Sequence, residues 1–158
     1  MYLLSLLLCN IAIADQFRAK VIKIIDGDSL VVVTGGEEKE IRLYGIDCPE
    51  FDQPYSKKAK RFVEKQILGR TLEVTAIATD RYNRLVAIID FNNSSINQQL
   101  IKKGLAWVYP KYCRKKICRS WRITEKNAVK NEINIWSNGN SVSPWVWKRK
   151  KHQQRFSN

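Results

Sequence analysis

The sequence lacks a hydrophobic run long enough to span a bilayer, which takes about 20 apolar residues. Its longest mostly apolar stretch is the first fourteen residues, which end in Ala12-Ile13-Ala14. A short apolar stretch closed by Ala-x-Ala is typical of a secretory leader, although no Lys or Arg precedes this one. Lipidation at Cys9 is a weaker alternative, because Leu8 before it is larger than such sites usually take. We expect residues 1–14 to be a signal peptide, no stable membrane span, and a secreted or periplasmic mature protein.

Histidine is nearly absent as well, since the only one is His152, close to the C-terminus. A zinc site built on Cys113 and Cys118 would need further ligands, and this histidine is far away in the sequence. The two cysteines are separated by four intervening residues in a basic, turn-like stretch, which favours a small-loop disulfide in an oxidising compartment. Cys48 is then left over as a free thiol.

Acidic residues are scarce in the last third of the chain. The formal net charge is +13, yet residues 1–50 hold five Lys/Arg against eight Asp/Glu, whereas residues 101–158 hold fifteen against two. This asymmetry points to a polyanionic partner, either nucleic acid or an anionic membrane face. A membrane-surface protein would carry a basic helix with a clean apolar face, and the last helical pattern is too ragged for that. The run Lys148–Lys151 is either a solvated tail or a tether for phosphates, and we favour the tether.

Five runs rich in β-branched and apolar residues are predicted to be strands, because turn residues separate them. They cover residues 17–25, 29–34, 40–46, 71–77 and 85–91, with a hairpin tip at Gly35-Gly36. Helical periodicity appears at residues 55–68, 94–104 and 119–136. This order favours a β-barrel plus α architecture, namely a five-stranded OB-fold barrel with about three packed helices over residues 15–137. Residues 138–158 are predicted to be a basic, aromatic tail.

Charged residues gather at three turns of this predicted barrel. The turn after the first strand carries Asp26 and Asp28, the end of the third strand carries Arg42, Asp47 and Glu50, and the turn between the last two strands carries Asp80, Tyr82 and Arg84. Paired carboxylates present the hard oxygens that calcium favours, and guanidinium groups bind phosphate through two parallel hydrogen bonds. A metal ion, a carboxylate base and two guanidinium groups are suited to attack on a phosphodiester. Each turn alone is more simply a solvated turn, so the prediction depends on all three together.

The three motifs in this order resemble the signature of the thermonuclease family, the staphylococcal-nuclease-like enzymes of the exported bacterial type. The similarity runs from about Val21 to Trp136 and includes GLAWVY at 104–109 and NEINIWS at 131–137. The resemblance implies an OB-fold barrel with packed helices, Ca²⁺ as cofactor, and hydrolysis of single- or double-stranded DNA and RNA to 3′-phosphate ends. Nothing in the sequence indicates an oligomer, so we expect a monomer.

The resemblance also gives each motif residue a role by its position. Asp28, Asp47 and the backbone carbonyl of Cys48 would bind the metal, with Asp26 behind these ligands. Glu50 would be the general base, and Arg42 and Arg84 would bind the phosphate and stabilise its developing charge. Tyr82 and Tyr109 would contact the nucleotide.

Two positions depart from the family pattern. Cys48 stands where the founding enzyme has threonine, and a ligating carbonyl does not depend on the side chain. Asn83 stands where glycine is usual, and asparagine is the next most tolerant residue if that turn needs φ > 0. The alternative function is a non-catalytic OB-fold module that only binds nucleic acid. The complete set of acids and arginines favours the nuclease over that module.

Overall fold

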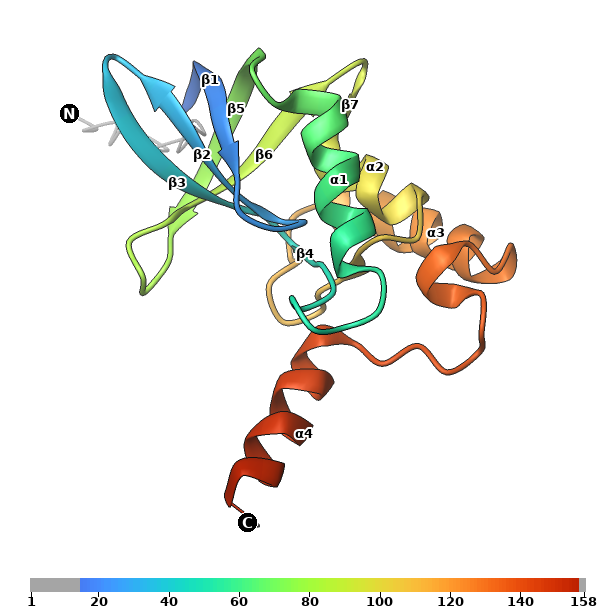
Figure 1. The fold of residues 1–158 in the computed structure, drawn as a ribbon. Coiled ribbons are helices and arrows are strands. Elements are labelled where there is room, and N and C mark those ends of the chain that lie inside the picture. Colours follow the sequence, from blue (N-terminus) through green and yellow to red (C-terminus); the bar gives the residue numbers. More distant parts are fainter. Residues whose placement is uncertain (1–14, 157–158) are drawn as a thin grey trace, which may run out of the picture.

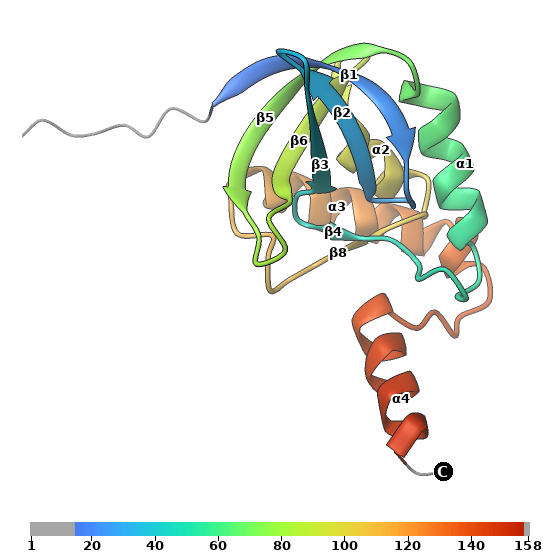
Figure 2. The same ribbon diagram turned by 60° about the vertical axis from the view of Figure 1, so that its left-hand side comes forward.

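A β-barrel forms the centre of the structure, a computed structural model that describes residues 15–156 (Figure 1). The expected signal peptide, residues 1–14, lies outside the described residues. Helices cover one side of the barrel and its lower end, and one further helix projects away from it (Figure 2). In the part of the chain that is described, no helix combines the length and the apolar character needed to cross a membrane.

Five strands make the barrel: β1 (Gln16–Ile24), β2 (Ser29–Thr34), β3 (Glu37–Leu43), β5 (Thr71–Thr79) and β6 (Leu85–Phe91). They follow the order β3-β2-β1-β5-β6 with antiparallel neighbours, and β3 closes the barrel by pairing in parallel with β6. The short β7 (Ser94–Ser95) pairs with the end of β6. The predicted fold class, a five-stranded OB-fold barrel with packed helices, is therefore confirmed.

The barrel interior is filled by alternate residues of these strands, as the period of two in a strand requires. Leu30 and Val32 point inward from β2, and Ile41 and Leu43 point inward from β3, all at most 1% exposed. The hairpin tip between these strands lies at Gly35-Gly36, where both residues have positive φ. This turn was predicted from the two glycines, which adopt positive φ without steric cost.

The third predicted strand, residues 40–46, has different bounds in the structure. It begins earlier, at Glu37, and ends at Leu43, because Gly45 with φ 70° turns the chain. A separate two-residue strand β4 (Ile46–Asp47) follows and pairs with β8 (Trp107–Val108) outside the barrel sheet. A side chain at Gly45 would collide with Cys113, since a Cβ there would lie 2.7 Å from its Sγ. The bend thus separates Asp47 from the barrel sheet and places it in the β4–β8 pair.

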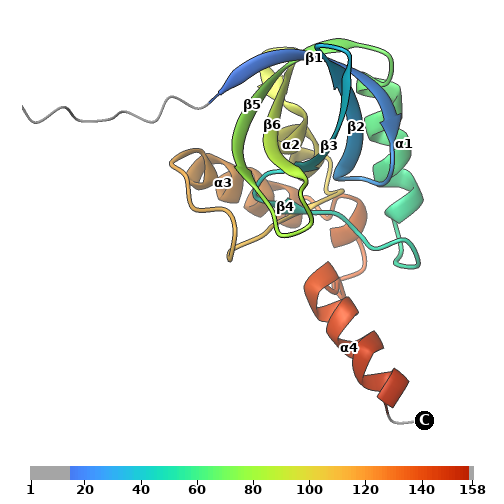
Figure 3. The same cartoon turned by 90° about the vertical axis from the view of Figure 1, so that its left-hand side faces the viewer.

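Helices α1 (Ser56–Ile67), α2 (Ile96–Lys102) and α3 (Ile117–Lys130) are close to the three predicted segments. In α1 the side chains of Ala59, Val63 and Ile67 are buried on one face, as the helical spacing predicts. Helix α3 ends before the predicted limit, and a 3₁₀ turn η1 (Asn134–Trp136) follows it. Figure 3 shows α3 running beneath the barrel.

The C-terminal tail is not an irregular segment, because residues Pro144–Phe156 form a fourth helix, α4. Pro144 takes the first position, where a missing N–H costs no hydrogen bond and the fixed φ suits a helix. The carbonyl oxygen of Ser143 accepts hydrogen bonds from the backbone N–H groups of Val146 and Trp147. Helix α4 starts beside the β4 segment and extends away from the barrel (Figures 1 to 3).

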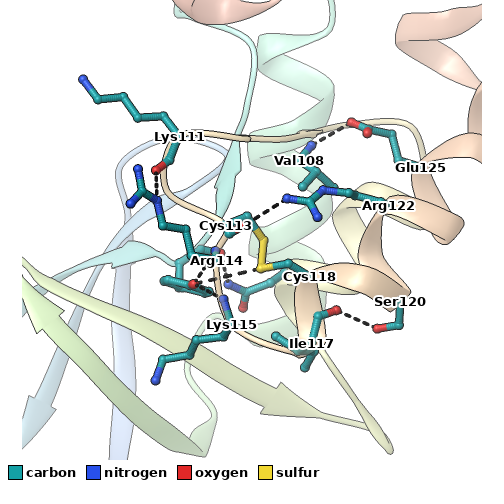
Figure 4. Close-up of a disulfide and its surroundings, with 12 residues drawn as sticks. Val108, Lys111, Cys113, Arg114, Lys115, Ile117, Cys118, Ser120, Arg122 and Glu125 are labelled. Atoms are coloured by element: carbon teal, nitrogen blue, oxygen red, sulfur yellow. Dashed lines mark hydrogen bonds between the residues drawn. A yellow bond between two sulfur atoms is a disulfide. The ribbon is translucent and has the colours of Figure 1, made fainter.

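Cys113 and Cys118 form a disulfide between β8 and the first turn of α3, with an S–S distance of 2.09 Å (Figure 4). The loop between them is held by Tyr44, whose hydroxyl accepts from the backbone N–H groups of Arg114 and Lys115 at 2.9 and 3.0 Å. Cys48 is a buried free cysteine elsewhere in the molecule.

Candidate active site

The first motif is a tight turn between β1 and β2 that places one carboxylate inside the protein. Asp26 is exposed, and its Oδ1 accepts the backbone N–H of Asp28 at 2.9 Å. This bond fixes the backbone of Asp28, whose side chain is buried. Asp26 therefore holds the backbone of Asp28 in place through an Asx-type turn, and its role behind the metal ligands stays a prediction.

Gly27 between them is needed for close approach. A Cβ at this position would lie 2.8 Å from Cβ and Sγ of Cys48 and 2.9 Å from Cβ of Ala59 in α1. The turn packs directly on Cys48, whose backbone N–H donates to the Asp28 carboxylate. The absence of a side chain at Gly27 thus brings the first motif against the second.

Arg42 joins the carboxylates of the first two motifs. It pairs with Ser29 across the β2–β3 ladder, which puts it beside Asp28. Its guanidinium forms ion pairs with Asp28 through Nη1 and with Asp47 through Nη2. Nη2 also donates to the carbonyl of Ile46 at 3.3 Å. The structure thus brings three predicted site residues, Arg42, Asp28 and Asp47, into direct contact.

The charges in this cluster do not balance. Asp28 and Asp47 are 4% and 2% exposed, and together they oppose the single positive charge of Arg42. Oδ2 of Asp47 is buried and has no hydrogen-bond partner among the described residues. A buried carboxylate oxygen normally has such a partner, because burial without one costs free energy. The unpartnered oxygen and the excess negative charge both suit a cation.

The candidate ligand atoms suit calcium better than they suit a metal ion that must be held by many side chains. Within residues 15–156 there is no group of three or more His, Cys, Asp or Glu side chains that would hold a metal ion by itself. Two carboxylates, Asp28 and Asp47, and the backbone carbonyl of Cys48 are all oxygen donors. Calcium accepts carboxylate, main-chain carbonyl and water oxygens in flexible geometry. These residues are therefore chemically suited to a calcium ion.

Cys48 lies in the middle of this charged region. Burial raises the pKa of its thiol well above the ordinary value, and Arg42 opposes the rise. The carboxylates of Asp26, Asp47 and Glu50 raise the pKa of the thiol further. Cys48 is therefore a neutral thiol, and its influence on the site comes from its backbone.

Glu50 lies in the turn after β4, where Gln53 holds its backbone. Oε1 of Gln53 accepts the N–H of Glu50 at 3.1 Å, and the N–H of Gln53 donates to the carbonyl of Glu50 at 2.8 Å. Nε2 of Gln53 donates to the carbonyl of Val142, just before α4. Gln53 is buried and was not singled out in the sequence, because a glutamine in a polar turn has no local signature of this role.

Arg84 and its neighbours form the third motif, in the turn between β5 and β6. Oδ2 of Asp80 accepts from Nε of Arg84 at 2.8 Å, and Oδ1 accepts the backbone N–H groups of Tyr82 and Arg84 at 2.9 and 3.0 Å. Asn83 has a positive φ of 61°. Asparagine tolerates this conformation better than most residues other than glycine, as expected for its place in this turn. Tyr82 is 63% exposed, and the guanidinium of Arg84 lies 5.5 Å from its ring centroid.

Arg84 and Arg42 lie near each other on the barrel, but their guanidinium groups bind different partners. Arg84 Nη1 lies 4.0 Å from Glu40, so the side chain is on the Glu40 side of β3. Arg42 is two residues further along β3 and therefore shares that face. Arg84 contacts its own turn and Glu40, whereas Arg42 contacts Asp28 and Asp47. The two guanidinium groups flank the same edge of the barrel, Arg42 from β3 and Arg84 from the turn between β5 and β6.

Tyr109 lies just after β8, and an aromatic side chain of α4 covers it. The rings of Tyr109 and Trp145 are stacked with centroids 4.7 Å apart and 10° between their planes. Tyr112 contacts Tyr109 edge-on at 4.8 Å. Trp145, one of the aromatic residues of the predicted basic, aromatic tail, thus docks beside the site.

Helix α4 also contacts the Glu50 turn with three polar side chains. Lys148 Nζ lies 2.9 Å from Oε1 of Glu50. Trp147 Nε1 donates to Asp52 at 3.1 Å, and Lys151 pairs with the same carboxylate. The hydrogen bonds from Lys151 and Trp147 lower the pKa of Asp52. A stacked aromatic pair contributes about 0.5–1.5 kcal/mol, and exposed ion pairs are screened by water and add little, so such contacts hold a helix in place only weakly.

Comparison with known proteins connects this geometry to a family. Residues 40–138 match the family model described as staphylococcal nuclease homologue. A Haemophilus influenzae protein named "Uncharacterized endonuclease" is 30% identical over 138 residues, which are 87% of this chain and 76% of that protein. "Micrococcal nuclease" of Shigella flexneri is 27% identical over 85% of this chain and 82% of its own length. "Staphylococcal-like nuclease CAN1" of Arabidopsis thaliana is 36% identical over 70% of this chain, which corresponds to 33% of the plant protein.

The matched region begins in β3 and ends just after η1, so it contains Arg42, Asp47, Glu50 and Arg84. It covers more than half of the chain, and the first motif, with Asp28, lies next to it in space through Arg42. The predicted family is therefore confirmed, and this chain belongs to the family of staphylococcal nuclease homologues.

Proposed function

We propose that this protein is a calcium-dependent phosphodiesterase that hydrolyses DNA and RNA and leaves 3′-phosphate ends. One observation carries the proposal: the guanidinium of Arg42 lies between the buried carboxylates of Asp28 and Asp47, and one carboxylate oxygen has no partner among the described residues. This is a site for a cation and a phosphate side by side. The names of the relatives, which include an endonuclease and a micrococcal nuclease, support a hydrolase that acts on nucleic acids.

Asp28, Asp47 and the Cys48 carbonyl would hold the calcium ion, which supplies positive charge next to the scissile phosphate when bound. Arg42 binds that phosphate, because its planar group donates two parallel hydrogen bonds to phosphate oxygens. Glu50 accepts a proton from the attacking water. Arg84 stabilises the negative charge that builds on the phosphoryl oxygens. The water oxygen forms a bond to phosphorus while the bond to the 5′ oxygen breaks, the 5′ oxygen takes up a proton to become a hydroxyl group, and the phosphate remains on the 3′ side.

Asp80 and Gln53 serve this chemistry through the residues they hold. Asp80 accepts two hydrogen bonds from Arg84, one from the side chain and one from the backbone. Gln53 fixes the backbone of Glu50 on both sides. Exposed Tyr82 and the ring of Tyr109 offer surfaces on which a base can stack.

A module that only binds nucleic acid is the competing function. It would need the basic surface and the aromatic rings, but it would not need buried carboxylates in contact with an arginine. Such carboxylates repel a polyanion and are costly to bury. Their presence at Asp28 and Asp47 therefore favours catalysis.

The test is to incubate the mature protein, whose chain starts near Asp15, with single-stranded DNA and with RNA. Each incubation contains either calcium or excess chelator. Cleavage is expected only with calcium. Asp47→Ala should abolish the calcium-dependent cleavage while the circular dichroism spectrum stays unchanged. Asp90→Ala, which removes an exposed carboxylate at the far end of β6, should retain full cleavage. Undiminished cleavage in chelator would refute the calcium requirement.

We also propose that residues 1–14 direct export, that the mature protein is a secreted or periplasmic monomer, and that the disulfide forms there. An oxidising compartment is where the Cys113–Cys118 bond would persist. Fractionation of the producing cell, with N-terminal sequencing of the mature protein, tests the export. Intact chain found only in the cytoplasm would contradict it.

A further inference from the structure

Helix α4 contacts two residues that the proposed chemistry needs free. Trp145 stacks on Tyr109, and Lys148 pairs with Glu50. We propose that α4 is a cover that makes the active site selective for long nucleic-acid strands over mono- and dinucleotides. This inference rests on the nuclease function proposed above. A strand with several phosphates displaces the cover, and a ligand with one phosphate does not.

The aromatic contact takes the position of a stacked base. The planes of Trp145 and Tyr109 are 10° apart with centroids at 4.7 Å, which is the arrangement of two stacked rings. Tyr112 lies against Tyr109 edge-on. A base cannot stack on the covered face of Tyr109 until Trp145 leaves it. Stacking of a base on this face of Tyr109 and the seated position of α4 are therefore mutually exclusive.

The cationic contact engages the proposed base. Lys148 Nζ lies 2.9 Å from Oε1 of Glu50. The ammonium group occupies the space beside that oxygen, which an attacking water would need to approach it. The seated helix thus opposes water activation as well as base stacking.

The chemistry of α4 explains why a long strand would remove it. The helix contains no Asp or Glu, and Lys148, Arg149, Lys150 and Lys151 are exposed on it. Phosphates of a polyanion compete with Glu50 and Asp52 for the ammonium groups of Lys148 and Lys151. A strand delivers many phosphates at once and releases counterions as each one is neutralised, whereas a dinucleotide delivers one phosphodiester. Displacement therefore depends on strand length.

The experiment compares the full mature chain with a variant that ends at Ser143, both with calcium. The substrates are a dinucleoside monophosphate and a single-stranded DNA of about 20 nucleotides. Because the seated helix reduces the fraction of competent sites, its removal should raise kcat/KM for the dinucleotide about tenfold. The value for the long strand should change much less, so the preference for long strands should shrink by about the same factor.

Point variants show which contacts act, without loss of the whole helix. Trp145→Ala and Lys148→Gln should each raise cleavage of the dinucleotide by part of the tenfold effect. Lys126→Gln removes an exposed cation from α3 and should leave it unchanged. A fall in cleavage of both substrates in the shortened chain would show that α4 is a wall of the substrate site, and would overturn the proposal. Equal preference for long strands in both chains would overturn it as well.

A binding measurement separates this proposal from the nuclease function. The affinity for a mononucleotide with a 5′-phosphate, followed by titration calorimetry, should be about tenfold higher in the chain that ends at Ser143. If neither chain cleaves any substrate, the nuclease function is refuted, and the binding ratio still decides whether α4 covers Tyr109. Identical affinities would overturn the cover.

Discussion

Two buried carboxylates repel each other, and in this protein the guanidinium of Arg42 lies between those of Asp28 and Asp47. A lysine would reach only one of them well, because its charge is a single point, whereas the planar fork of arginine reaches both. The same fork matches a phosphate group. In the proposed function, Arg42 would therefore neutralise the site when no other cation is present and bind substrate when a cation takes over the carboxylates.

Substitution of Glu50 tests its proposed role as the general base. Glu50→Gln keeps the shape of the side chain and removes its ability to accept a proton at neutral pH. General-base catalysis is typically worth about 10²–10⁴-fold, so kcat should fall by that factor or more. Substrate affinity should change little, because Glu50 acts on water and not on the phosphate. Single-turnover kinetics and a binding titration with uncleaved DNA in chelator measure the two effects separately.

A control for this substitution is Glu132→Gln, which removes an exposed carboxylate in the turn after α3. It should retain the kcat of the unmodified protein. Near-normal kcat in Glu50→Gln would show that another group activates the water. Products with 5′-phosphates would show in addition that Arg42, Asp47 and Glu50 are arranged around the phosphate differently from the proposed way.

At the scale of elements, the turn between β5 and β6 acts as a unit that presents Arg84. Asp80 collects two backbone N–H groups and the side chain of Arg84, while Asn83 supplies the positive φ that the turn requires. The partial burial of Asp80 raises the pKa of its carboxyl, but the hydrogen bonds from Arg84 and Tyr82 lower it more. The charged form of Asp80 is thus the form that the folded turn prefers.

Asp80→Asn should lower kcat by loosening Arg84, with a smaller effect than loss of Arg84 itself. The pH dependence follows from the lowered pKa of Asp80. A depressed pKa contributes stability above the unfolded value, near pH 4, and that stability is lost as pH falls through the folded value. The difference in melting temperature between the unmodified protein and Asp80→Asn should therefore be present at pH 7 and vanish in strong acid. A difference that persists unchanged at low pH would show that the charge of Asp80 is not its cause.

Elements specified by short-range patterns could be predicted from the sequence, and elements specified by distant contacts could not. The strand at 29–34 and the buried face of α1 follow from periods of 2 and 3.6, which neighbouring residues set. Helix α4 was missed because much of what seats it lies elsewhere in the chain, including Asp52, which binds Trp147 across 95 positions. A local pattern contains no information about such a partner.

The site shows the same division. Arg42, Asp28 and Asp47 are brought into contact in the structure, and they could be selected in advance because their residue types stand at family positions. Gln53 and Lys148 contact Glu50 just as closely, but a glutamine in a turn and a lysine in a basic run are ordinary surface residues in sequence. Their roles depend on where the chain returns, which only the fold reveals.

At the scale of the whole molecule, charge is divided between the site and its surroundings. The acids of the proposed metal site lie in the first 50 residues, where Asp/Glu outnumber Lys/Arg by eight to five. The last 58 residues, which include α3 and α4, hold fifteen Lys/Arg and two Asp/Glu. The positive segments attract a polyanion and offset the repulsion by the site acids. In the proposed function, substrate would thus be drawn to the molecule by the basic part of the chain and cleaved at the acidic site.

The disulfide is the covalent link at this scale, because it fastens the segment after Tyr109 to α3. The backbone N–H of Cys113 donates to the carbonyl of Tyr109 at 2.8 Å, and Arg122 of α3 donates to the carbonyl of Cys113 at 3.2 Å. Closing so short a loop constrains the unfolded chain and contributes about 2 kcal/mol on the chain-entropy estimate. For a domain of this size such a change corresponds to a shift of roughly 4–8 °C in melting temperature.

Reduction of the exported protein should therefore lower its melting temperature by several degrees while nuclease activity at 25 °C persists, because no proposed catalytic group lies in the loop. The double variant Cys113→Ser/Cys118→Ser should have the melting temperature of the reduced protein and should be insensitive to reductant.

Cys48 should remain a thiol, because its burial disfavours the thiolate that would attack a disulfide. Mass spectrometry of peptides prepared without reductant checks the pairing directly. A disulfide at Cys48, or free thiols at Cys113 and Cys118, would contradict this pairing. If reductant lowers the melting temperature of the double variant by the same amount, the loss of stability arises at Cys48 and not at the Cys113–Cys118 bond.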